Sequence, residues 1–335
     1  MDPTAYATTA PPPTLMYFLG IDGGGSRTRA CLCDETGSIL GQGVGGPSNP
    51  CTQSPGDCLK HIRVAMQQAM ASVPSKSIAA VHLGIAGAGN AAAHASLEAI
   101  AAELFDRKRT QVTISNDLRI AHMGGLLGQA GIALVAGTGS GCLGIDSAGR
   151  AVVTGGWGDY IDDAGSGSWI GLRALQVCVR QADGRSPGAN LQQRVLDFLK
   201  LESMSQFKQQ FRAAELAREE RARLAREILS LAEAGDSPAI EIIDEAIHEL
   251  TGLLQANQQA LGLAEIRILL MGGLNDLAYF REKLQASIEA QLPGALVVRP
   301  RLNPTAGALL IGMRSMGIQL NEPLIKALET ASKKS

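Results

Sequence analysis

The first half of the chain alternates between two patterns. Short apolar runs are typical of buried strands, and stretches with apolar residues three or four positions apart are typical of helices. The pattern predicts three strands, then a helix, a strand, a helix, a strand and a helix. The predicted strands lie at 18–22, 28–34, 38–44, 79–85 and 111–115, and the predicted helices at 58–73, 91–104 and 118–126.

The same order begins again at residue 131, which indicates an internal duplication. The second half contains predicted strands at 131–136, 142–146, 151–154, 266–271 and 296–299, and predicted helices at 166–182, 191–199, about 216–263, 279–290 and 304–316. Strands that alternate with helices predict an α/β fold.

The length of 335 residues exceeds what one compact core usually supports, so two domains are expected. We expect the first at 15–118, with the C-terminal helix as a candidate to complete it. The second is expected at 119–335 and carries a helical insertion. Residues 1–14 are rich in Ala, Thr and Pro, lack the pattern of a signal peptide, and are expected to be a disordered lead.

Two glycine-rich turns follow apolar strands, one in each half, at 22–26 and 137–141. Glycines permit positive φ and let backbone N–H groups approach an anion, and the hydroxyl side chains in both turns add donors. Either turn alone could be structural, but one turn in each half favours a nucleotide held between two domains. Asp22, at the end of its strand, adds a hard oxygen ligand for Mg²⁺.

Asp117 is the candidate general base. Ligands of α/β domains bind beyond the carboxyl ends of the strands, where Asp22, Asp117 and both turns fall, together with the glycine pair at 272–273. A carboxylate there can take the proton from a hydroxyl that attacks a phosphoryl group. The alternative is a helix N-cap formed by Asn116 or Asp117. The two phosphate-type turns favour the catalytic interpretation.

The segment 155–166 combines glycines, aspartates and aromatic residues before a helix, which suits a sugar-binding loop. Its alternative is a capped helix entry with aspartates near the positive end of the helix dipole. Another polar loop, at 45–49, offers Ser48 and Asn49 to hydroxyl or amide groups. The arginine-rich run at 217–226 has interleaved glutamates and helical spacing, and is interpreted as a solvated helix face.

Composition excludes several function classes. The net charge of −2 and the 4% aromatic content give no case for a nucleic-acid or membrane partner. No GxxxxGK[ST] motif is present, and both GxGxxG matches lack the strand–turn–helix context of a dinucleotide site. Six cysteines without metal-binding spacing fit free thiols in a reducing cytoplasm.

Three motifs resemble those of the actin/hexokinase/Hsp70-like ATPase superfamily. They are LGIDGGGSRT at 19–28 and AGTGSG at 136–141, for phosphate, and LMGGL at 270–274, for adenosine. Within that superfamily, three further motifs resemble those of the N-acetylglucosamine and glucosamine kinase branch, which is of BadF/BadG/BcrA/BcrD type. They are SNDLRIA at 115–121, GGWG at 155–158 and DAGSGS at 163–168. The likeness spans about 16–317 and implies two duplicated ribonuclease H-like (actin-like ATPase) domains with a cleft between them.

The resemblance also implies cofactors and residue roles. The cofactors are ATP and Mg²⁺, with Asp22 ordering the metal and Asp117 acting as base for the sugar 6-hydroxyl. The residues implied to bind the nucleotide are Gly24, Gly25, Ser26, Thr138, Gly139, Gly272 and Gly273. The residues implied to contact the amino sugar are Asn49, Gly156, Trp157 and Asp163.

The expected activity is therefore ATP-dependent phosphorylation of N-acetylglucosamine, with glucosamine as the alternative substrate. Asp162 stands where the N-acetylglucosamine kinases carry glycine, and this extra carboxylate either favours an ammonium group or faces solvent. An ATPase activator of a dehydratase is the alternative from another class, but it would need cysteines placed for an iron–sulfur cluster. A zinc site is not expected, and a homodimer is left open.

Overall fold

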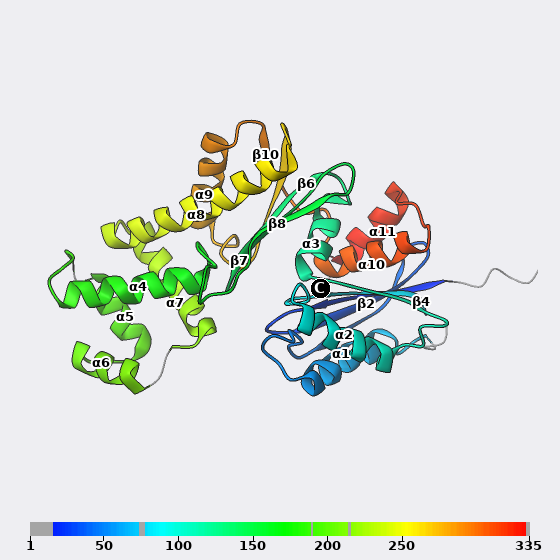
Figure 1. Ribbon diagram of the computed structural model, residues 1–335, viewed down its shortest axis with the longest axis horizontal. Helices are drawn as coiled ribbons and strands as arrows, with labels where there is room; N and C mark the ends of the chain where they lie inside the picture. Colours follow the sequence, from blue (N-terminus) through cyan, green and yellow to red (C-terminus); the bar gives the residue numbers. More distant parts are fainter. Residues whose placement is uncertain (1–15, 74–77, 189, 214–215, 333–335) are drawn as a thin grey trace, which may run out of the picture. The chain divides into compact units, whose positions relative to one another are not determined.

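The structure is a computed structural model that describes residues 16–73, 78–188, 190–213 and 216–332 (Figure 1). The expected disordered lead at 1–14 lies outside the described residues. The chain divides into two compact units, one formed by 1–124 with 302–335 and the other by 125–301. Each unit contains one five-stranded sheet.

The sheet of the first unit has the strand order β3-β2-β1-β4-β5, in which β1, β2 and β3 are antiparallel and β1, β4 and β5 are parallel. Its strands are β1 (Tyr17–Gly23), β2 (Thr28–Asp34), β3 (Ile39–Gly45), β4 (Ile78–Ile85) and β5 (Gln111–Ser115). The helices are α1 (Pro55–Ala69), α2 (Ala91–Leu104), α3 (Asp117–Leu126), which runs into the second unit, α10 (Pro304–Ser315) and α11 (Glu322–Ser332).

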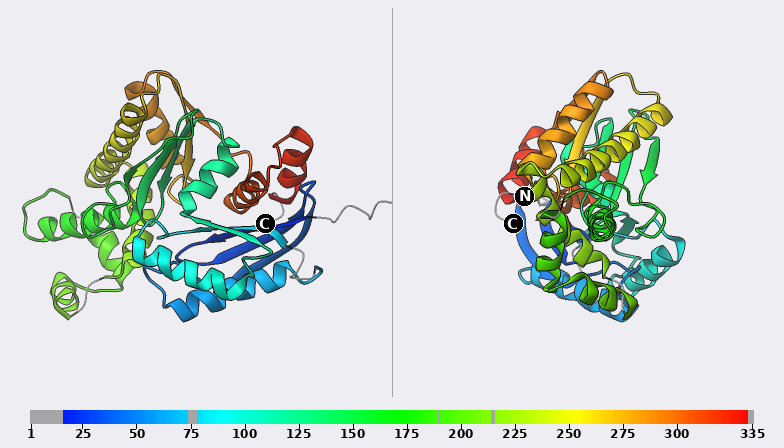
Figure 2. Two further views of the ribbon diagram at one scale, coloured as in Figure 1. Left: turned by 45° about the vertical axis from the view of Figure 1, so that its right-hand side comes forward. Right: turned by 90° about the vertical axis from the view of Figure 1, so that its left-hand side faces the viewer.

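Helices cover both faces of this sheet: α1 and α2 lie on one face and α10 lies on the other (Figures 1 and 2). Glycines allow the close approach on the α10 face, because a Cβ on Gly20 of β1 would lie 2.6 Å from the Thr305 carbonyl oxygen. The apolar side chains next to Gly20 along β1, Leu19 and Ile21, point to the opposite face and belong to its core.

The second unit repeats this topology. Its strand order is β10-β9-β6-β7-β8, with β6, β7 and β8 antiparallel and β6, β9 and β10 parallel. The strands are β6 (Gly131–Ala136), β7 (Ser140–Ile145), β8 (Ala151–Gly155), β9 (Ile266–Met271) and β10 (Ala295–Val298). The helices are α4 (Gly167–Ala182), α5 (Asn190–Leu199), α6 (Met204–Ala213), α7 (Arg218–Glu233), α8 (Ser237–Leu261) and α9 (Ala278–Gln291). The predicted α/β fold of two duplicated domains is confirmed.

The helical insertion differs from the long predicted stretch at 216–263, which divides into α7 and α8. Gly235 adopts a φ of 93° between them, and the Asp236 side chain caps α8 by accepting from the Ala239 N–H at 3.1 Å. The helices α6 and α11 were not predicted. A glycine followed by an N-cap residue is a helix-break signal, and the pair Gly235 and Asp236 made this signal available in the sequence.

The domain division also differs in detail from the expected boundary at 118/119. It falls after Gly124, inside α3, and the C-terminal segment from Leu302 belongs to the first unit, because α10 packs on β1 and β4. The C-terminal helix therefore completes the first unit. Among the described residues, no helix has both the length and the apolar composition that a membrane span needs.

Candidate functional site

The first glycine turn closes the hairpin between β1 and β2. The Gly24 N–H donates to the Arg27 carbonyl oxygen at 3.0 Å, and the Gly24 carbonyl oxygen accepts from the Ser48 N–H at 3.0 Å. Gly25 and Ser26 form the exposed tip, where a Cβ on Gly25 would meet no atom within 4 Å. The tip can thus present backbone N–H groups and a hydroxyl to an anion.

Asp22 directly precedes this turn, and a second carboxylate, Asp117, acts on it electrostatically. Asp22 ends β1 with 16% of its side chain exposed, and its Oδ2 lies 3.8 Å from Nη1 of Arg29. Burial raises the pKa of Asp22 to about 6; the charge of Arg29 opposes this shift and the charge of Asp117 adds to it. Burial also raises the pKa of Asp117, against the backbone N–H groups that bond to its carboxylate. The predicted metal ligand and the predicted base are therefore electrostatic neighbours.

The helix-cap alternative for Asp117 can be decided from the contacts at the start of α3. The Asn116 side chain accepts from the Arg119 N–H at 3.1 Å, which is the N-cap interaction. Asp117 is the first residue of the helix, and its carboxylate accepts from its own backbone N–H and from that of Leu118, the latter at 3.1 Å. Asn116 is the N-cap residue of α3, so the Asp117 carboxylate is not required for capping.

A buried histidine supports the turn before Asp117. In His82 of β4, Nδ1 lies 2.7 Å from Thr113 Oγ1 and Nε2 lies 2.9 Å from Ser115 Oγ. The Ser115 hydroxyl donates to the Asn116 carbonyl oxygen at 3.0 Å, so it accepts from the Nε2–H, and the Thr113 hydroxyl donates to Nδ1. Burial lowers the pKa of His82 to about 4. A neutral histidine thus ties β4 and β5 to this turn.

Asn49, the predicted sugar ligand of the first unit, lies in a loop held against the same strand ends. The buried Ser48 hydroxyl accepts from Thr28 Oγ1 at 2.7 Å, which joins the loop to β2. The Asn49 Oδ1 accepts from the Cys51 N–H at 2.9 Å and lies against Gly87, after β4. The structure therefore brings Asn49 to the end of the sheet that carries Asp22.

In the second unit, the second glycine turn is seated on the N-terminus of α4. The Gly137 N–H donates to the Gly139 carbonyl oxygen at 2.9 Å and closes the turn. The carbonyl oxygens of Gly137 and Thr138 accept from the first N–H groups of α4, those of Gly167 at 2.8 Å and Ser168 at 3.2 Å. These bonds fix the turn between β6 and β7.

The predicted adenosine motif borders this turn. The Leu274 N–H donates to the Ala136 carbonyl oxygen at 3.1 Å, immediately before the turn. Gly272 has a φ of 91°, and any Cβ there would overlap the Ala136 carbonyl group. The structure thus brings Gly272 and Gly273 beside the second phosphate-type turn.

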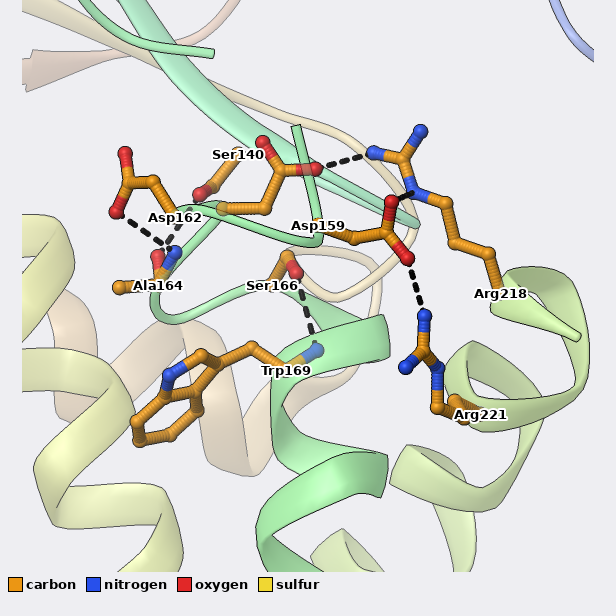
Figure 3. Close-up of polar contacts among 9 residues, drawn as sticks. Ser140, Asp159, Asp162, Ala164, Ser166, Trp169, Arg218 and Arg221 are labelled. Carbon is orange, nitrogen blue, oxygen red and sulfur yellow. Dashed lines mark hydrogen bonds and ion pairs between the residues drawn. The ribbon is translucent and has the colours of Figure 1, made fainter. Parts of the chain in front are cut away.

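The loop 156–166, here named the acid loop, is joined to α7 by ion pairs (Figure 3). Arg218 pairs with Asp163, and Arg221 pairs with Asp159. Asp163 is buried, and burial raises its pKa, although the Arg218 charge opposes this shift. The arginine-rich run at 217–226 is therefore not a purely solvated face, and the interpretation from sequence was wrong for these two residues.

Other predicted sugar residues of the acid loop are exposed. Gly156 has a φ of 75° and lies beside Gly141 of the second turn, and the Trp157 side chain is 73% exposed. The Ser140 hydroxyl donates to the Ala164 carbonyl oxygen at 2.8 Å and holds the loop to β7. Asp162, whose role was left open, is half-buried, and its carboxylate accepts from the Ala164 N–H at 3.4 Å.

Each unit thus gathers its own share of the predicted site. Among the described residues, no group of three or more His, Cys, Asp and Glu side chains is arranged to hold a metal ion. Magnesium in phosphoryl-transfer sites commonly takes only one or two carboxylates together with substrate phosphates. Asp22 offers one such carboxylate and fits that donor set. Its pKa is raised by burial and by the charge of Asp117.

Comparison with known proteins gives amino-sugar kinases among the relatives of this chain. An N-acetylmuramic acid/N-acetylglucosamine kinase of Clostridium acetobutylicum is 27% identical over 302 residues, which cover 89% of this chain and 98% of the relative. A glucosamine kinase of Vibrio cholerae is 28% identical over 301 residues, which cover 88% and 95% of the two chains.

A solved structure agrees with these relatives. The crystal structure of a candidate N-acetylglucosamine kinase from Chromobacterium violaceum has a TM-score of 0.72 at 28% identity, and covers 89% of this chain and 99% of that one. The family model of the BadF/BadG/BcrA/BcrD ATPases matches residues 19–312, a range that holds every predicted site residue. The chain belongs to the BadF/BadG/BcrA/BcrD ATPase family.

Proposed function

We propose that this protein is an ATP-dependent amino-sugar kinase that phosphorylates the 6-hydroxyl of N-acetylglucosamine. The observation that carries the proposal is the carboxylate of Asp117, at the carboxyl end of β5, close enough to Asp22 to raise its pKa. A base beside a metal-ordering carboxylate and a glycine turn is the arrangement that phosphoryl transfer to a hydroxyl requires. Related kinases of N-acetylglucosamine and glucosamine support it.

Asp117 accepts the proton of the attacking hydroxyl in this proposal. Its raised pKa increases its affinity for that proton while the carboxylate still accepts a hydrogen bond that orients the hydroxyl. The Asn116 cap and the His82 chain hold the turn that carries it. Mg²⁺, held at Asp22, would neutralise charge on the transferring phosphoryl group.

The nucleotide would be bound by backbone and hydroxyl donors rather than by a lysine. Gly25 and Ser26 supply donors from the first unit, at the turn that the Gly24 N–H closes on the Arg27 carbonyl oxygen, and Thr138 and Gly139 supply donors from the second. The bonds from Gly167 and Ser168 pre-organise the second turn, so little order is lost when it binds phosphate. Gly272 and Gly273 would flank the adenosine.

The amino sugar would be contacted by Asn49 and by the acid loop, through Gly156, Trp157 and Asp163. A fixed carboxylate such as Asp163 accepts hydrogen bonds from sugar hydroxyls, and Trp157 offers an apolar face. Glucosamine is the rival substrate, and a preference for it would point to the additional carboxylate of Asp162. We further propose that the enzyme works in the cytoplasm, where its six free cysteines remain reduced.

A coupled assay of ATP consumption with N-acetylglucosamine, glucosamine, N-acetylmannosamine and glucose tests the proposal. We expect turnover with N-acetylglucosamine to exceed that with the other sugars. ATP hydrolysis that no sugar stimulates would contradict the proposal. Hydrolysis of that kind, together with an iron–sulfur signal in anaerobically purified protein, would favour a dehydratase activator instead.

A further inference from the structure

Two arginines at the start of α7, Arg218 and Arg221, pair with aspartates of the acid loop. Three positions apart, they lie on one side of the helix, and Figure 3 shows both guanidinium groups directed toward Asp159 of the acid loop. The Arg221 side chain is 17% exposed and that of Arg218 33%, whereas Arg223 on the same helix is 69% exposed. The first two arginines are thus structural contacts rather than solvated side chains.

Arg218 makes the contact of most consequence. Its Nη2 donates to Oδ2 of Asp163, whose side chain is only 3% exposed, and its Nε lies 4.0 Å from Oδ1 of Asp159. A carboxylate buried to this extent needs a partner for its charge. Removal of Arg218 would leave Asp163 free to turn toward solvent or to take up a proton.

The backbone of Asp163 also depends on surrounding contacts. Its φ of 52° lies in the left-handed region, which is unfavourable for a residue with a side chain and persists where the neighbouring structure enforces it. Glycines at 155, 156, 158 and 165 also adopt positive φ, so the loop has little regular structure of its own to hold this conformation. The ion pair with Arg218 and a backbone hydrogen bond from Gly158 hold the Asp163 carboxylate.

The same pair lies against the second phosphate-type turn. A Cβ on Gly139 would overlap the Arg218 guanidinium group and would lie 2.8 Å from Oδ2 of Asp163. The carboxylate is thus confined on two sides, by α7 and by the turn. A group confined in this way loses little freedom when it binds a ligand.

We propose that Arg218 is a positioning residue for the amino sugar, which fixes the Asp163 carboxylate so that it accepts hydrogen bonds from the sugar. The inference builds on the proposed function, in which Asp163 contacts the sugar. In this inference, α7 contributes to sugar affinity together with the acid loop.

The test uses the full chain and measures sugar binding without ATP, by calorimetry or by intrinsic tryptophan fluorescence. We expect Arg218→Met to weaken N-acetylglucosamine binding about 10- to 100-fold, the usual effect of losing a hydrogen bond to a charged group. ATP affinity is expected to change less than about twofold. Arg218→Lys, which keeps the charge, should recover part of the loss, and Arg223→Met is the matched control with wild-type binding.

A double-mutant cycle separates positioning from a general loss of structure. If Arg218 acts through Asp163, Arg218→Met adds no further loss of sugar affinity in an Asp163→Asn background. Equal sugar affinity in wild type and Arg218→Met, or a loss confined to ATP affinity, would overturn the inference while leaving the proposed function intact. Wild-type protein that binds none of the amino sugars would contradict the proposed function itself, and this inference with it.

Discussion

Acid should destabilise the first unit through His82. An unfolded histidine has a pKa near 6.5, whereas burial lowers that of His82 to about 4. The unfolded chain therefore binds a proton more readily than the native protein throughout this interval. The stabilising contribution is complete above about pH 6.5 and is lost as the pH falls toward 4. Between pH 7 and pH 4.5 the loss amounts to about 2.5 kcal/mol.

The measurement compares wild type with His82→Gln, whose amide does not titrate. Chemical unfolding of the first unit is followed at pH 7 and at pH 4.5 in both proteins. Other groups titrate alike in the two proteins, so the stability difference between them isolates the histidine. We expect wild type to be the more stable at pH 7, and its advantage to shrink by about 2.5 kcal/mol at pH 4.5.

An independent probe accompanies this measurement. Ring resonances of His82 in an NMR titration should show a neutral ring with the proton on Nε2 down to about pH 4. A pH-independent gap between wild type and His82→Gln, or a ring that titrates near 6.5, would refute the reasoning.

Three further outcomes are expected. Asp117→Asn should lower kcat about 10²- to 10⁴-fold, the usual contribution of a general base, with the fold and ATP binding retained; near wild-type turnover would exclude Asp117 as the base. Asp22→Asn should raise the Mg²⁺ concentration for half-maximal activity at least about tenfold, and an unchanged titration would remove Asp22 from the metal site. Gly272→Ala, at a φ of 91° and with its Cβ overlapping the Ala136 carbonyl group, should destabilise the second unit by at least about 1 kcal/mol. Thermal unfolding measures this loss, and a variant as stable as wild type would contradict it.

The strands, the glycine turns and the duplicated order could be predicted because each depends on local sequence. Apolar runs bounded by glycine define β6 and β9, and both were predicted with the bounds that the structure has. The turn at 137–141 was recognisable because glycine and hydroxyl residues at that spacing have few structural uses.

The supporting contacts could not be predicted, because their partners are distant in sequence. Arg218 pairs with Asp163 across 55 positions, and nothing local distinguishes it from the exposed Arg223 five residues later. His82 meets Thr113 and Ser115 across 31 and 33 positions. Only the parallel pairing of β4 with β5 places these side chains together. The packing of α10 on the first unit likewise depends on tertiary structure.

In the proposed reaction, the protein transfers the γ-phosphoryl group of ATP to the 6-hydroxyl of an amino sugar. The most direct test incubates the protein with ATP, Mg²⁺ and N-acetylglucosamine and identifies the product by phosphorus and proton NMR. We expect N-acetylglucosamine 6-phosphate and an equal amount of ADP, and both to form about 10²- to 10⁴-fold more slowly with Asp117→Asn. ADP accompanied only by inorganic phosphate, or phosphorylation at another hydroxyl, would contradict it.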